Sequence, residues 1–344
     1  MKKILIIRFS SIGDIIQCMS VVDNLKNNYP ESILHWVTRK DMASLLQIDS
    51  RIDRIWEFNR NNGLIGLIKL ALKLRQEKYT HIYDAHSNIR SNLLKIVLCP
   101  FGLCNYLSKQ QIITRHKDRL KRLLLFKFKI NLFPKPFRSF ESFKAPLRKF
   151  KDYQNKSLLI KDQSHYHFPV KIQSKMDELL SPFNNNKWIC LVPSAAWELK
   201  RWPVEYWQKL VIGKPDINFV VIGGPNDFFC EDIKMSAPER VINLAGKTTL
   251  LESFYVIFKA SYIISGDTGF LHAADLFKKP GQALIGPTAF GFPSGKDMKV
   301  MEIDLYCRPC TKDGNVKCIN KIHKKCMLDI LPEYVIKESE QFFR

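Results

Sequence analysis

The chain has 344 residues, of which 46% are hydrophobic and 25% are charged. This composition is typical of a globular protein and excludes a disordered, collagen-like or small disulfide-stabilised chain. The length suggests two domains. The longest apolar stretch, Leu93–Leu107, is about 15 residues long and contains Lys95, whereas a membrane-spanning helix needs about 20 apolar residues. The apolar run after Met1 is too short for a signal peptide, so we expect a cytoplasmic protein.

The net charge of +21 is concentrated in one part of the chain. Residues 106–176 contain 18 lysines and arginines but only 4 acidic residues, a net charge of +14. Such a basic surface attracts phosphate-rich partners, namely nucleic acid, anionic lipid or an anionic glycan, although it is also compatible with an ordinary solvated surface. Since no helix-turn-helix, RRM or KH signature accompanies the charge, we expect no nucleic-acid partner.

The N-terminal half begins with an alternation of strands and helices. The continuous apolar run Ile4–Ile7 predicts a strand buried on both faces. Apolar residues from Ile15 to Leu25 recur at helical spacing, and Ile33–Val37 is the next strand. A further helix is expected over 64–76 and a strand over 81–84. A strand–helix–strand opening predicts a parallel sheet covered by helices.

A boundary between domains is expected around Tyr166–Pro169, after a segment rich in Pro, Lys and Phe. The alternation then starts again with a helix over Val170–Leu180. Each of the later strands ends in a loop of small residues. This pattern is typical of an open α/β sheet that binds its ligand at the carboxyl ends of the strands. The expected strands are Trp188–Val192, Phe219–Ile222, Tyr262–Ser265 and Ala283–Ile285.

The segment Ser265–His272 carries the clearest candidate site. A strand gives way to a helix through Gly266 and Gly269, and the free N–H groups of a helix start bind phosphate well. Thr268 would add a hydroxyl donor, whereas Asp267 suits sugar hydroxyls better than phosphate. The alternative is purely structural: Asp267 or Thr268 caps the helix and His272 is buried in the core.

Lys200 and Arg201 directly precede a helix that begins near Pro203. Cations at this position could neutralise a diphosphate leaving group, on which negative charge grows as a sugar bond breaks. An exposed basic pair without function is equally compatible with the sequence.

Asp14 lies at the start of a helix, directly after the first buried strand. It is either a first-turn acid favoured by the helix dipole or a general base at the carboxyl edge of the sheet. Polar residues after the strand at 81–84 could line the same edge; they are Asp84, His86, Asn88 and Arg90.

Four cysteines near the end of the chain follow the spacing Cys307-x2-Cys310-x7-Cys318-x7-Cys326. Four thiolates that include a C-x-x-C pair can form a tetrahedral site for structural zinc or iron. Reduced thiols and redox-linked disulfides are the alternatives. The sequence has no GxGxxG, Walker A or HExxH motif, which disfavours a dinucleotide oxidoreductase, a P-loop enzyme and a zinc protease of that type.

Taken together, these motifs resemble the heptosyltransferases of glycosyltransferase family nine, which build the inner core of lipopolysaccharide. The matching segments occur in the family's order along nearly the whole chain. They are residues 6–14, Asp84–Ser91, Lys200–Pro203, Gly223–Pro225, Gly266–Gly269 with His272, and Gly286–Thr288.

The resemblance implies a GT-B fold, in which two Rossmann-like domains face each other across a cleft. Residues 1–168 would bind the acceptor and 169–330 the nucleotide-sugar donor, while a helix over 331–344 would cross back to the first domain. The implied reaction is an inverting, metal-independent transfer of heptose from ADP-heptose to an inner-core lipopolysaccharide acceptor, with no cofactor required.

The resemblance also assigns roles to single residues. Asp14 would be the catalytic base, and Lys200 would hold the donor phosphates during catalysis. The implied donor-binding residues are Ser194, Lys200, Asp227, Asp267, Thr268, Gly269, His272, Gly286, Pro287 and Thr288. The implied acceptor-binding residues are Arg8, Ser11, Gly13, Asp84, His86, Asn88 and Arg90.

Two features depart from the family pattern or extend it. Residues 193–195 read Pro-Ser-Ala instead of the usual Pro-Gly-Ala, and the cysteine cluster is similar to that of relatives that glycosylate proteins and bind iron. Another nucleotide sugar, a protein acceptor and a non-catalytic glycan-binding role therefore stay open. The basic stretch 106–176 would face an anionic lipid-linked acceptor and the inner leaflet of the membrane, and Leu123–Phe128 would lie either at that surface or in a core helix.

Overall fold

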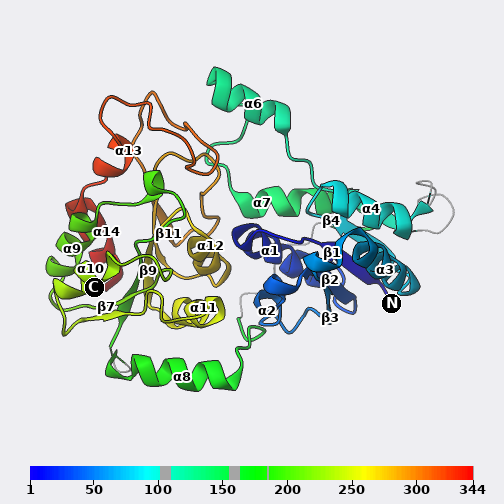
Figure 1. The fold of residues 1–344 in the computed structure, drawn as a ribbon, viewed down its shortest axis with the longest axis horizontal. Coiled ribbons are helices and arrows are strands. Elements are labelled where there is room, and N and C mark those ends of the chain that lie inside the picture. The colour runs from blue at the N-terminus through cyan, green and yellow to red at the C-terminus, as the bar shows by residue number, and fades with distance from the viewer. Residues whose placement is uncertain (101–109, 155–162, 184–185, 344) are drawn as a thin grey trace. The chain divides into compact units, whose positions relative to one another are not determined.

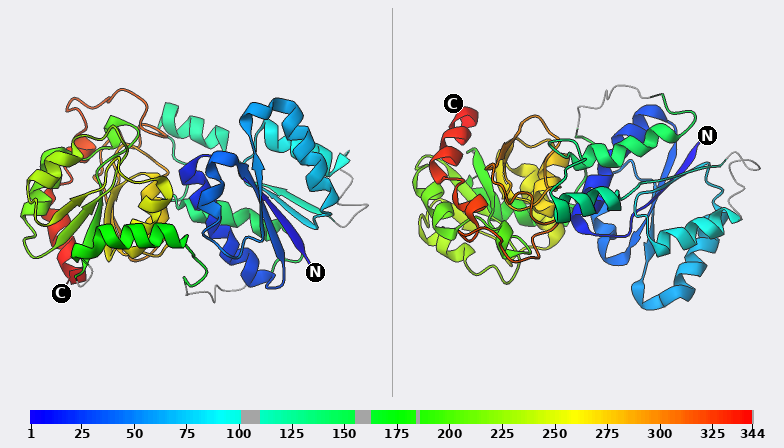
Figure 2. Two further views of the ribbon diagram at one scale, coloured as in Figure 1. Left: turned by 60° about the horizontal axis from the view of Figure 1, so that its bottom comes forward. Right: turned by 90° about the horizontal axis from the view of Figure 1, so that it is seen from above.

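The computed structural model describes residues 1–100, 110–154, 163–183 and 186–343. The chain divides into two compact units. Unit 1 consists of residues 1–118 and 140–167, and unit 2 of residues 119–139 and 168–344. Each unit contains one parallel β-sheet flanked by helices (Figures 1 and 2). Within the described ranges, no helix has the length and hydrophobicity needed to cross a membrane.

The sheet of unit 1 has five strands in the order β3-β2-β1-β4-β5, and every neighbouring pair is parallel. The strands are β1 (Lys3–Ile7), β2 (Ile33–Arg39), β3 (Arg54–Phe58), β4 (His81–Asp84) and β5 (Gln111–Thr114). The helices are α1 (Ile12–Asn28), α2 (Ala43–Leu46), α3 (Gly63–Gln76), α4 (Ile89–Leu98) and α7 (Ser139–Lys144), whose first residue belongs to unit 2. One hydrophobic core forms where Leu5 and Ile7 of β1 pack with Leu74 of α3 and Leu94 of α4.

The sheet of unit 2 has six parallel strands in the order β11-β10-β9-β6-β7-β8. The strands are β6 (Trp188–Val192), β7 (Asn218–Val221), β8 (Val241–Asn243), β9 (Tyr262–Gly266), β10 (Gly281–Leu284) and β11 (Met298–Met301). The helices are α6 (Arg119–Phe128), α8 (Val170–Leu180), α9 (Val204–Ile212), α10 (Cys230–Met235), α11 (Leu250–Lys259), α12 (Gly269–Leu276), α13 (Lys325–Leu328) and α14 (Pro332–Phe343).

Both sheets have Rossmann-like topology. In each unit the first strand is central, the second and third strands extend to one side, and the later strands extend to the other. The strand order therefore reverses between β1 and β4 in unit 1 and between β6 and β9 in unit 2. In open α/β sheets, ligands bind at the carboxyl ends of the strands at this switch point. The predicted α/β architecture with two parallel sheets is confirmed, and each unit has one position where a ligand site is expected.

The C-terminal helix α14 packs against α9 and β10 of unit 2. Val335 is fully buried there, and its carbonyl accepts a 2.9 Å hydrogen bond from Gln282 Nε2. The ring of Phe342 lies 5.1 Å from that of Tyr262. The apolar face of α14 thus completes the core of unit 2. The expected crossing of residues 331–344 to the first domain stays a prediction.

Residues 119–139 belong to unit 2, although the residues before and after them belong to unit 1. The ring of Phe290 lies 4.9–5.8 Å from the rings of Phe126, Phe133 and Phe137. Arg138 Nη1 donates a 2.7 Å hydrogen bond to the carbonyl of Ser294. Aromatic packing of this kind binds the segment to the loop after β10, and a sequence pattern cannot reveal such a distant partner.

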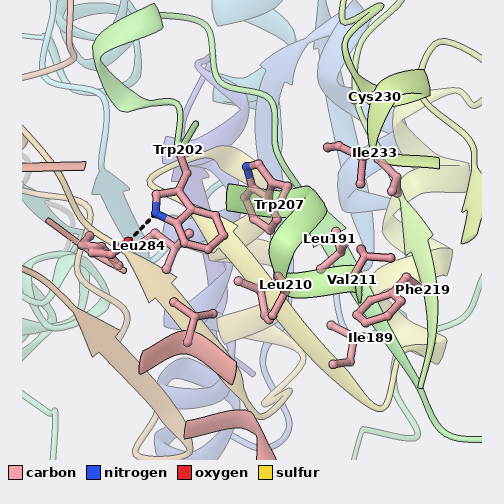
Figure 3. Close-up of a cluster of buried hydrophobic side chains, with 14 of the residues drawn as sticks. Ile189, Leu191, Trp202, Trp207, Leu210, Val211, Phe219, Cys230, Ile233 and Leu284 are labelled. Atoms are coloured by element: carbon pink, nitrogen blue, oxygen red, sulfur yellow. Dashed lines mark hydrogen bonds between the residues drawn. The ribbon is translucent and has the colours of Figure 1, made fainter. Parts of the chain in front are cut away.

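The core of unit 2 contains a tryptophan from the Lys200–Pro203 motif. Trp202 is 3% exposed, and its ring lies 5.0 Å from that of Trp207, perpendicular to it (Figure 3). Its indole N–H donates a 2.8 Å hydrogen bond to the carbonyl of Ile330. Part of this motif is therefore structural, because it anchors the loop before α9 to the segment before α14.

Replacing Trp202 by phenylalanine should lower the free energy of unfolding of unit 2 by about 2 kcal/mol, because the buried carbonyl of Ile330 loses its hydrogen-bond donor. Urea denaturation followed by far-UV circular dichroism measures this loss. The matched control is Trp197→Phe in the same loop, where the side chain is 40% exposed. Equal denaturation midpoints for the two variants would contradict the structural role of Trp202.

Candidate active site

The switch point of unit 1 is bridged by a buried arginine. Arg8 directly follows β1 and is 5% exposed. Its Nη1 donates a 2.7 Å hydrogen bond to the carbonyl of Ala85, the residue after β4. Its Nη2 lies 2.5 Å from Oδ2 of Asp14 in the first turn of α1. The guanidinium thus joins the two strand ends of the switch point and holds Asp14 at the carboxyl edge of the sheet.

Asp14 is both a capping residue and the exposed acid of this edge. Its side chain is 41% exposed, and Oδ2 accepts a 3.0 Å hydrogen bond from the hydroxyl of Ser11, the N-cap of α1. Desolvation alone would raise the pKa of Asp14, but Arg8, Ser11 and Arg115 outweigh it and lower the pKa below its usual value of 3.8. Asp14 is therefore ionised at neutral pH and can accept a proton. Gly13 precedes it in the same turn.

A second arginine at this edge was missed by the sequence analysis. Arg115 follows β5, and its guanidinium lies 3.9 Å from the ring centroid of Phe143. Its Nη2 donates a 2.8 Å hydrogen bond to the hydroxyl of Ser142. A cation directly after the run Gln111–Thr114 was the available signal, but that strand itself was not predicted. Arg8 and Arg115 together place two positive charges near Asp14, where an anionic ligand would be favoured.

The other residues that were predicted to bind the acceptor differ in their burial and in their hydrogen-bond partners. Asp84 is fully buried and accepts 3.0 and 2.8 Å hydrogen bonds from the backbone N–H groups of His86 and Ser87, while Lys95 Nζ lies 2.8 Å from its Oδ2. Asn88 caps α4 by accepting a 3.0 Å bond from the N–H of Ser91. The side-chain oxygens of Asp84 and Asn88 therefore bind groups of the protein itself, and these bonds fix the loop after β4.

His86 and Arg90 differ in their surroundings. The ring of His86 lies 5.3 Å from that of Phe9 in an edge-to-face arrangement. Burial and the nearby Arg8 lower the pKa of His86 to about 4, so the ring is neutral at physiological pH. Arg90 is exposed on α4. Of the predicted acceptor residues, the structure brings Arg8 and Ser11 together around the carboxylate of Asp14, the predicted base.

The switch point of unit 2 contains a second ion pair. Lys200 ends the short 3-10 helix η6 (Glu198–Lys200), and its Nζ lies 3.1 Å from Oδ2 of Asp267, the residue after β9. The hydroxyl of Thr288 donates a 2.7 Å hydrogen bond to the same oxygen. His272 Nε2 lies 3.8 Å from the other carboxylate oxygen. Three elements after three different strands thus meet at one buried carboxylate.

Asp267 is held ionised by these partners. Burial would raise its pKa, but Lys200, His272 and Thr288 together lower it. A Cβ added to Gly291 would lie 2.2 Å from Cγ of Asp267, so the loop after β10 covers the carboxylate directly. In this structure Asp267 therefore positions Lys200. The expectation that it contacts sugar hydroxyls requires the Gly291 loop to leave it accessible.

The start of α12 has the geometry of a capped helix. Thr268 is the N-cap, and its hydroxyl accepts a 3.4 Å hydrogen bond from the N–H of Leu271. Gly269 is the first helical residue, and His272 is buried one turn later. The structural alternative considered for this motif is thus realised in part. The dipole of α12 still favours an anion at this end of the helix.

The loops after β6 and β7 are tied together by charged side chains. Asp227 accepts a 2.7 Å hydrogen bond from the N–H of Gly224 and lies 3.4 Å from Nη2 of Arg201. The hydroxyl of Ser194 would lie 2.9 Å from a Cβ added to Gly223, so a larger residue at 223 would not fit. Asp227 was predicted to meet the donor, but here its carboxylate holds the Gly223–Gly224 turn.

The segment after Cys310 lies against the side chain of Lys200, and this neighbour was not predicted from the sequence. Thr311 pairs with Thr288 in a parallel bridge, and its hydroxyl accepts a 3.1 Å hydrogen bond from the N–H of Gly314. Gly314 has a φ of +97°, and a Cβ there would lie 3.0 Å from the side chain of Lys200. Position 314 therefore requires glycine, because another side chain would be strained at this φ and would press against Lys200. This loop contains no regular helix or strand, so periodicity and motifs in the sequence do not predict it.

The four clustered cysteines line one small cavity between η6 and the loop after Gly286 and Pro287. However, no group of three or more His, Cys, Asp or Glu side chains among the described residues has an arrangement that fits a metal ion. Burial raises the pKa of Cys326 to about 11 and also raises that of Cys310. The predicted structural zinc or iron is not supported.

The predicted loop after β10 contributes mainly through its backbone. Arg308 Nε donates a 2.6 Å hydrogen bond to the carbonyl of Gly286, and the N–H of Cys310 donates a 3.1 Å bond to that of Pro287. A Cβ on Gly286 would collide with Met327, at 2.4 Å from its sulfur. These contacts fix the position of Thr288, which then reaches Asp267.

Comparison with known proteins identifies the family. Residues 147–321 match the model of "Glycosyltransferase family 9 (heptosyltransferase)". Lipooligosaccharide heptosyltransferase 2 of Campylobacter jejuni (serotype O:6, strain 81116) is 29% identical over 183 residues, which is 50% of this chain but only 56% of the relative's own length. The same-named enzyme of Haemophilus ducreyi is 24% identical over 381 residues, covering 98% of this chain and 99% of the relative.

A solved structure supports the fold. The structure described as E. coli ADP-heptose lps heptosyltransferase II superimposes with a TM-score of 0.70 over 99% of this chain and 98% of its own, at 20% identity. This likeness confirms the GT-B fold that the sequence motifs implied. The family match covers half of the chain and includes Lys200, Asp267 and Thr288. The chain therefore belongs to glycosyltransferase family 9.

Proposed function

We propose that this protein transfers a heptose from ADP-heptose to an inner-core lipopolysaccharide acceptor, with inversion at the anomeric carbon and without a metal. The observation that carries the proposal is Asp14, an ionised and partly exposed carboxylate at the switch point of unit 1, held there by Arg8. The names of the relatives support heptose as the sugar, and ADP-heptose appears in the description of the E. coli structure.

In the proposed reaction Asp14 accepts the proton of the acceptor hydroxyl, and the hydroxyl oxygen attacks the anomeric carbon of heptose. The bond between this carbon and the diphosphate oxygen breaks, and its electron pair leaves with ADP. Because the attack comes from the side opposite the leaving group, the configuration inverts. Unit 1 would bind the acceptor and unit 2 the donor.

Lys200 would stabilise the negative charge that grows on the leaving diphosphate, assisted by the N-terminus of α12. These groups supply positive charge where other enzymes use a cation, which supports metal independence. The acceptor is expected to be an anionic lipid-linked glycan, and the basic stretch 106–176 favours such a partner. We accordingly place the protein in the cytoplasm, peripheral to the inner membrane.

The first test is thermal melting with ADP, UDP, GDP and CDP. A nucleotide at 100 times its dissociation constant should stabilise the protein by about 2.7 kcal/mol. A shift with ADP alone supports the proposed donor, whereas a shift with UDP or GDP contradicts the heptose assignment. No shift with any nucleotide would favour a non-catalytic glycan-binding protein.

The second test is transfer from ADP-heptose to a purified inner-core acceptor, followed by mass spectrometry, with and without EDTA. Equal rates with and without EDTA are expected. Loss of activity in EDTA that returns when a divalent cation is added would contradict metal independence.

The pH dependence of kcat/KM tests the assignment of the base. Because the pKa of Asp14 lies below its usual value, the carboxylate form, and with it the rate, should persist as the pH falls to about 5. Arg8→Met removes the cation and leaves the desolvation, so the pKa of Asp14 should rise and the acid limb should move toward neutral pH. Arg39→Met, which affects an exposed pair with Asp41, is the control. An acid limb that stays in place in Arg8→Met would contradict the role of Asp14.

A further inference from the structure

Helix α3 of unit 1 is apolar on two sides. One side faces the core through buried side chains, which are Leu67, Leu70, Ala71 and Leu74. The opposite side carries Leu64, Ile65, Ile68 and Leu72, which are 63%, 70%, 38% and 49% exposed. A surface helix of a globular protein ordinarily presents polar residues on its outer side. The outer side of α3 is thus an apolar face without a partner among the described residues.

The neighbouring helix also carries exposed apolar residues. Helix α4 packs against α3 (Figure 1). Its Ile89 and Ile96 are 87% and 63% exposed. These two residues are seven positions apart, so they lie on one side of α4. We call the set the α3–α4 surface; it consists of Leu64, Ile65, Ile68, Leu72, Ile89 and Ile96. Exposed leucine and isoleucine side chains gathered on two packed helices make this surface a candidate interaction site.

Every charged residue of the two helices is positive. Lys69, Lys73 and Arg75 are exposed on α3, and Arg90 is exposed on α4. No acidic residue occurs in the sequence from 58 to 76 or from 85 to 117. Leucine and isoleucine side chains interspersed with lysine and arginine are typical of helices that lie in the interface of an anionic bilayer.

The surface begins at the edge of the sheet that carries Asp14. Helix α3 follows β3 and α4 follows β4, so both helices start at the carboxyl ends of parallel strands, as α1 does after β1. Leu64, Ile65 and Ile89 lie in the first turns of their helices. Contact between these turns and a bilayer would bring the Asp14 edge close to the lipid headgroups, where the sugars of a lipid-linked acceptor are.

We propose that the α3–α4 surface binds anionic lipid bilayers, with the leucines and isoleucines entering the headgroup region and the cations contacting lipid phosphates. Its use in catalysis rests on the proposed function, but the binding itself does not. A second copy of the chain is the other candidate occupant. A symmetric contact between two copies would oppose like-charged faces, which disfavours it.

Sedimentation with vesicles tests the proposal. The protein should bind phosphatidylcholine vesicles that contain phosphatidylglycerol, and it should bind pure phosphatidylcholine weakly. The double variant Ile65→Gln with Leu72→Gln should weaken binding by about tenfold or more, because two apolar side chains no longer enter the bilayer. Both side chains are exposed, so the melting temperature should stay unchanged.

The matched control is Leu120→Gln with Leu123→Gln on α6, a basic helix of unit 2 whose two leucines are 69% and 52% exposed. Because α6 lies in the basic stretch 106–176, it is the competing membrane surface, and under the present proposal this variant should bind vesicles like the unmodified protein. Full vesicle binding by the α3 variant would overturn the proposal, as would loss of binding confined to the α6 variant. Sedimentation equilibrium gives the third outcome: a dimer that the α3 variant converts to a monomer would make the surface a self-interface.

The vesicle-binding result can be distinguished from a success or failure of the proposed function. Stabilisation by ADP and transfer to a delipidated acceptor fragment should be equal in the α3 variant and the unmodified protein. Vesicle binding without any transfer would therefore reject the glycosyltransferase assignment and keep the lipid surface, whereas transfer without vesicle binding would do the reverse.

Discussion

Replacing Asp14 by asparagine should lower kcat for heptose transfer by about three orders of magnitude, within the range that general bases contribute. Asparagine keeps the size of the side chain and can still contact Ser11, but it has no basicity for the proton of the acceptor hydroxyl. The ion pair with Arg8 is also lost. Initial rates with ADP-heptose and a purified acceptor measure the effect.

The matched control for Asp14 is Asp41→Asn, an exposed carboxylate that follows β2 of the same sheet and pairs with Arg39. This variant should transfer at the normal rate. Stabilisation by ADP should be normal in both variants, because we propose that unit 2 binds the donor. An Asp14→Asn variant with normal kcat would show that another group removes the proton.

Replacing Lys200 by methionine should lower kcat/KM for the donor by about two to three orders of magnitude, because no cation then faces the leaving diphosphate. The same change should destabilise the protein by about 3 kcal/mol, since the carboxylate of Asp267 stays buried without its principal counter-ion. Steady-state kinetics with varied ADP-heptose and urea denaturation measure the two effects.

The double variant Lys200→Met with Asp267→Asn separates these effects. Removing both charges should restore much of the stability, because no unpaired ion is left in the interior. It should not restore transfer. Lys175→Met is the matched control in the same unit, because it breaks the more exposed pair with Glu252. If the stable double variant regained the activity of the unmodified protein, Lys200 would serve only to neutralise Asp267.

The strands that the sequence revealed are the inner ones. The runs at Ile4–Ile7, Trp188–Val192 and Tyr262–Ser265 correspond to β1, β6 and β9, which have neighbours on both sides and are buried along almost their whole length. The four strands that were not predicted are β3, β5, β8 and β11, and these are the edges of the two sheets. An edge strand is covered less, so its sequence does not need a continuous apolar run.

The difference between inner and edge strands also explains which residues of the candidate site were predicted. Asp14 and Asp267 were found because each follows a buried strand, and Lys200 was found from the position of its motif after β6 and before a helix. Arg115 was missed because it follows the edge strand β5. The contacts of Lys200 with Gly314 and Asp267 arise from loops that are far apart in sequence, so periodicity and spacing cannot predict them.

The packing of residues 119–139 against Phe290 affects the order in which the chain folds during synthesis. The three phenylalanines of this segment leave the ribosome on the order of 150 residues before Phe290. At roughly 5–20 residues per second, this is a delay of about 8–30 s. During this time the nascent chain carries an aromatic, basic segment whose partner does not yet exist.

The order of synthesis also determines how the chain can be divided. Unit 1, which consists of residues 1–118 and 140–167, precedes most of unit 2, so it can begin to fold first. The 21 residues between these two ranges do not belong to its core. A recombinant fragment that starts at residue 168 would leave Phe290 without its aromatic neighbours. An autonomous donor unit therefore requires residues 119–139 to be supplied, for example by fusing them to this fragment.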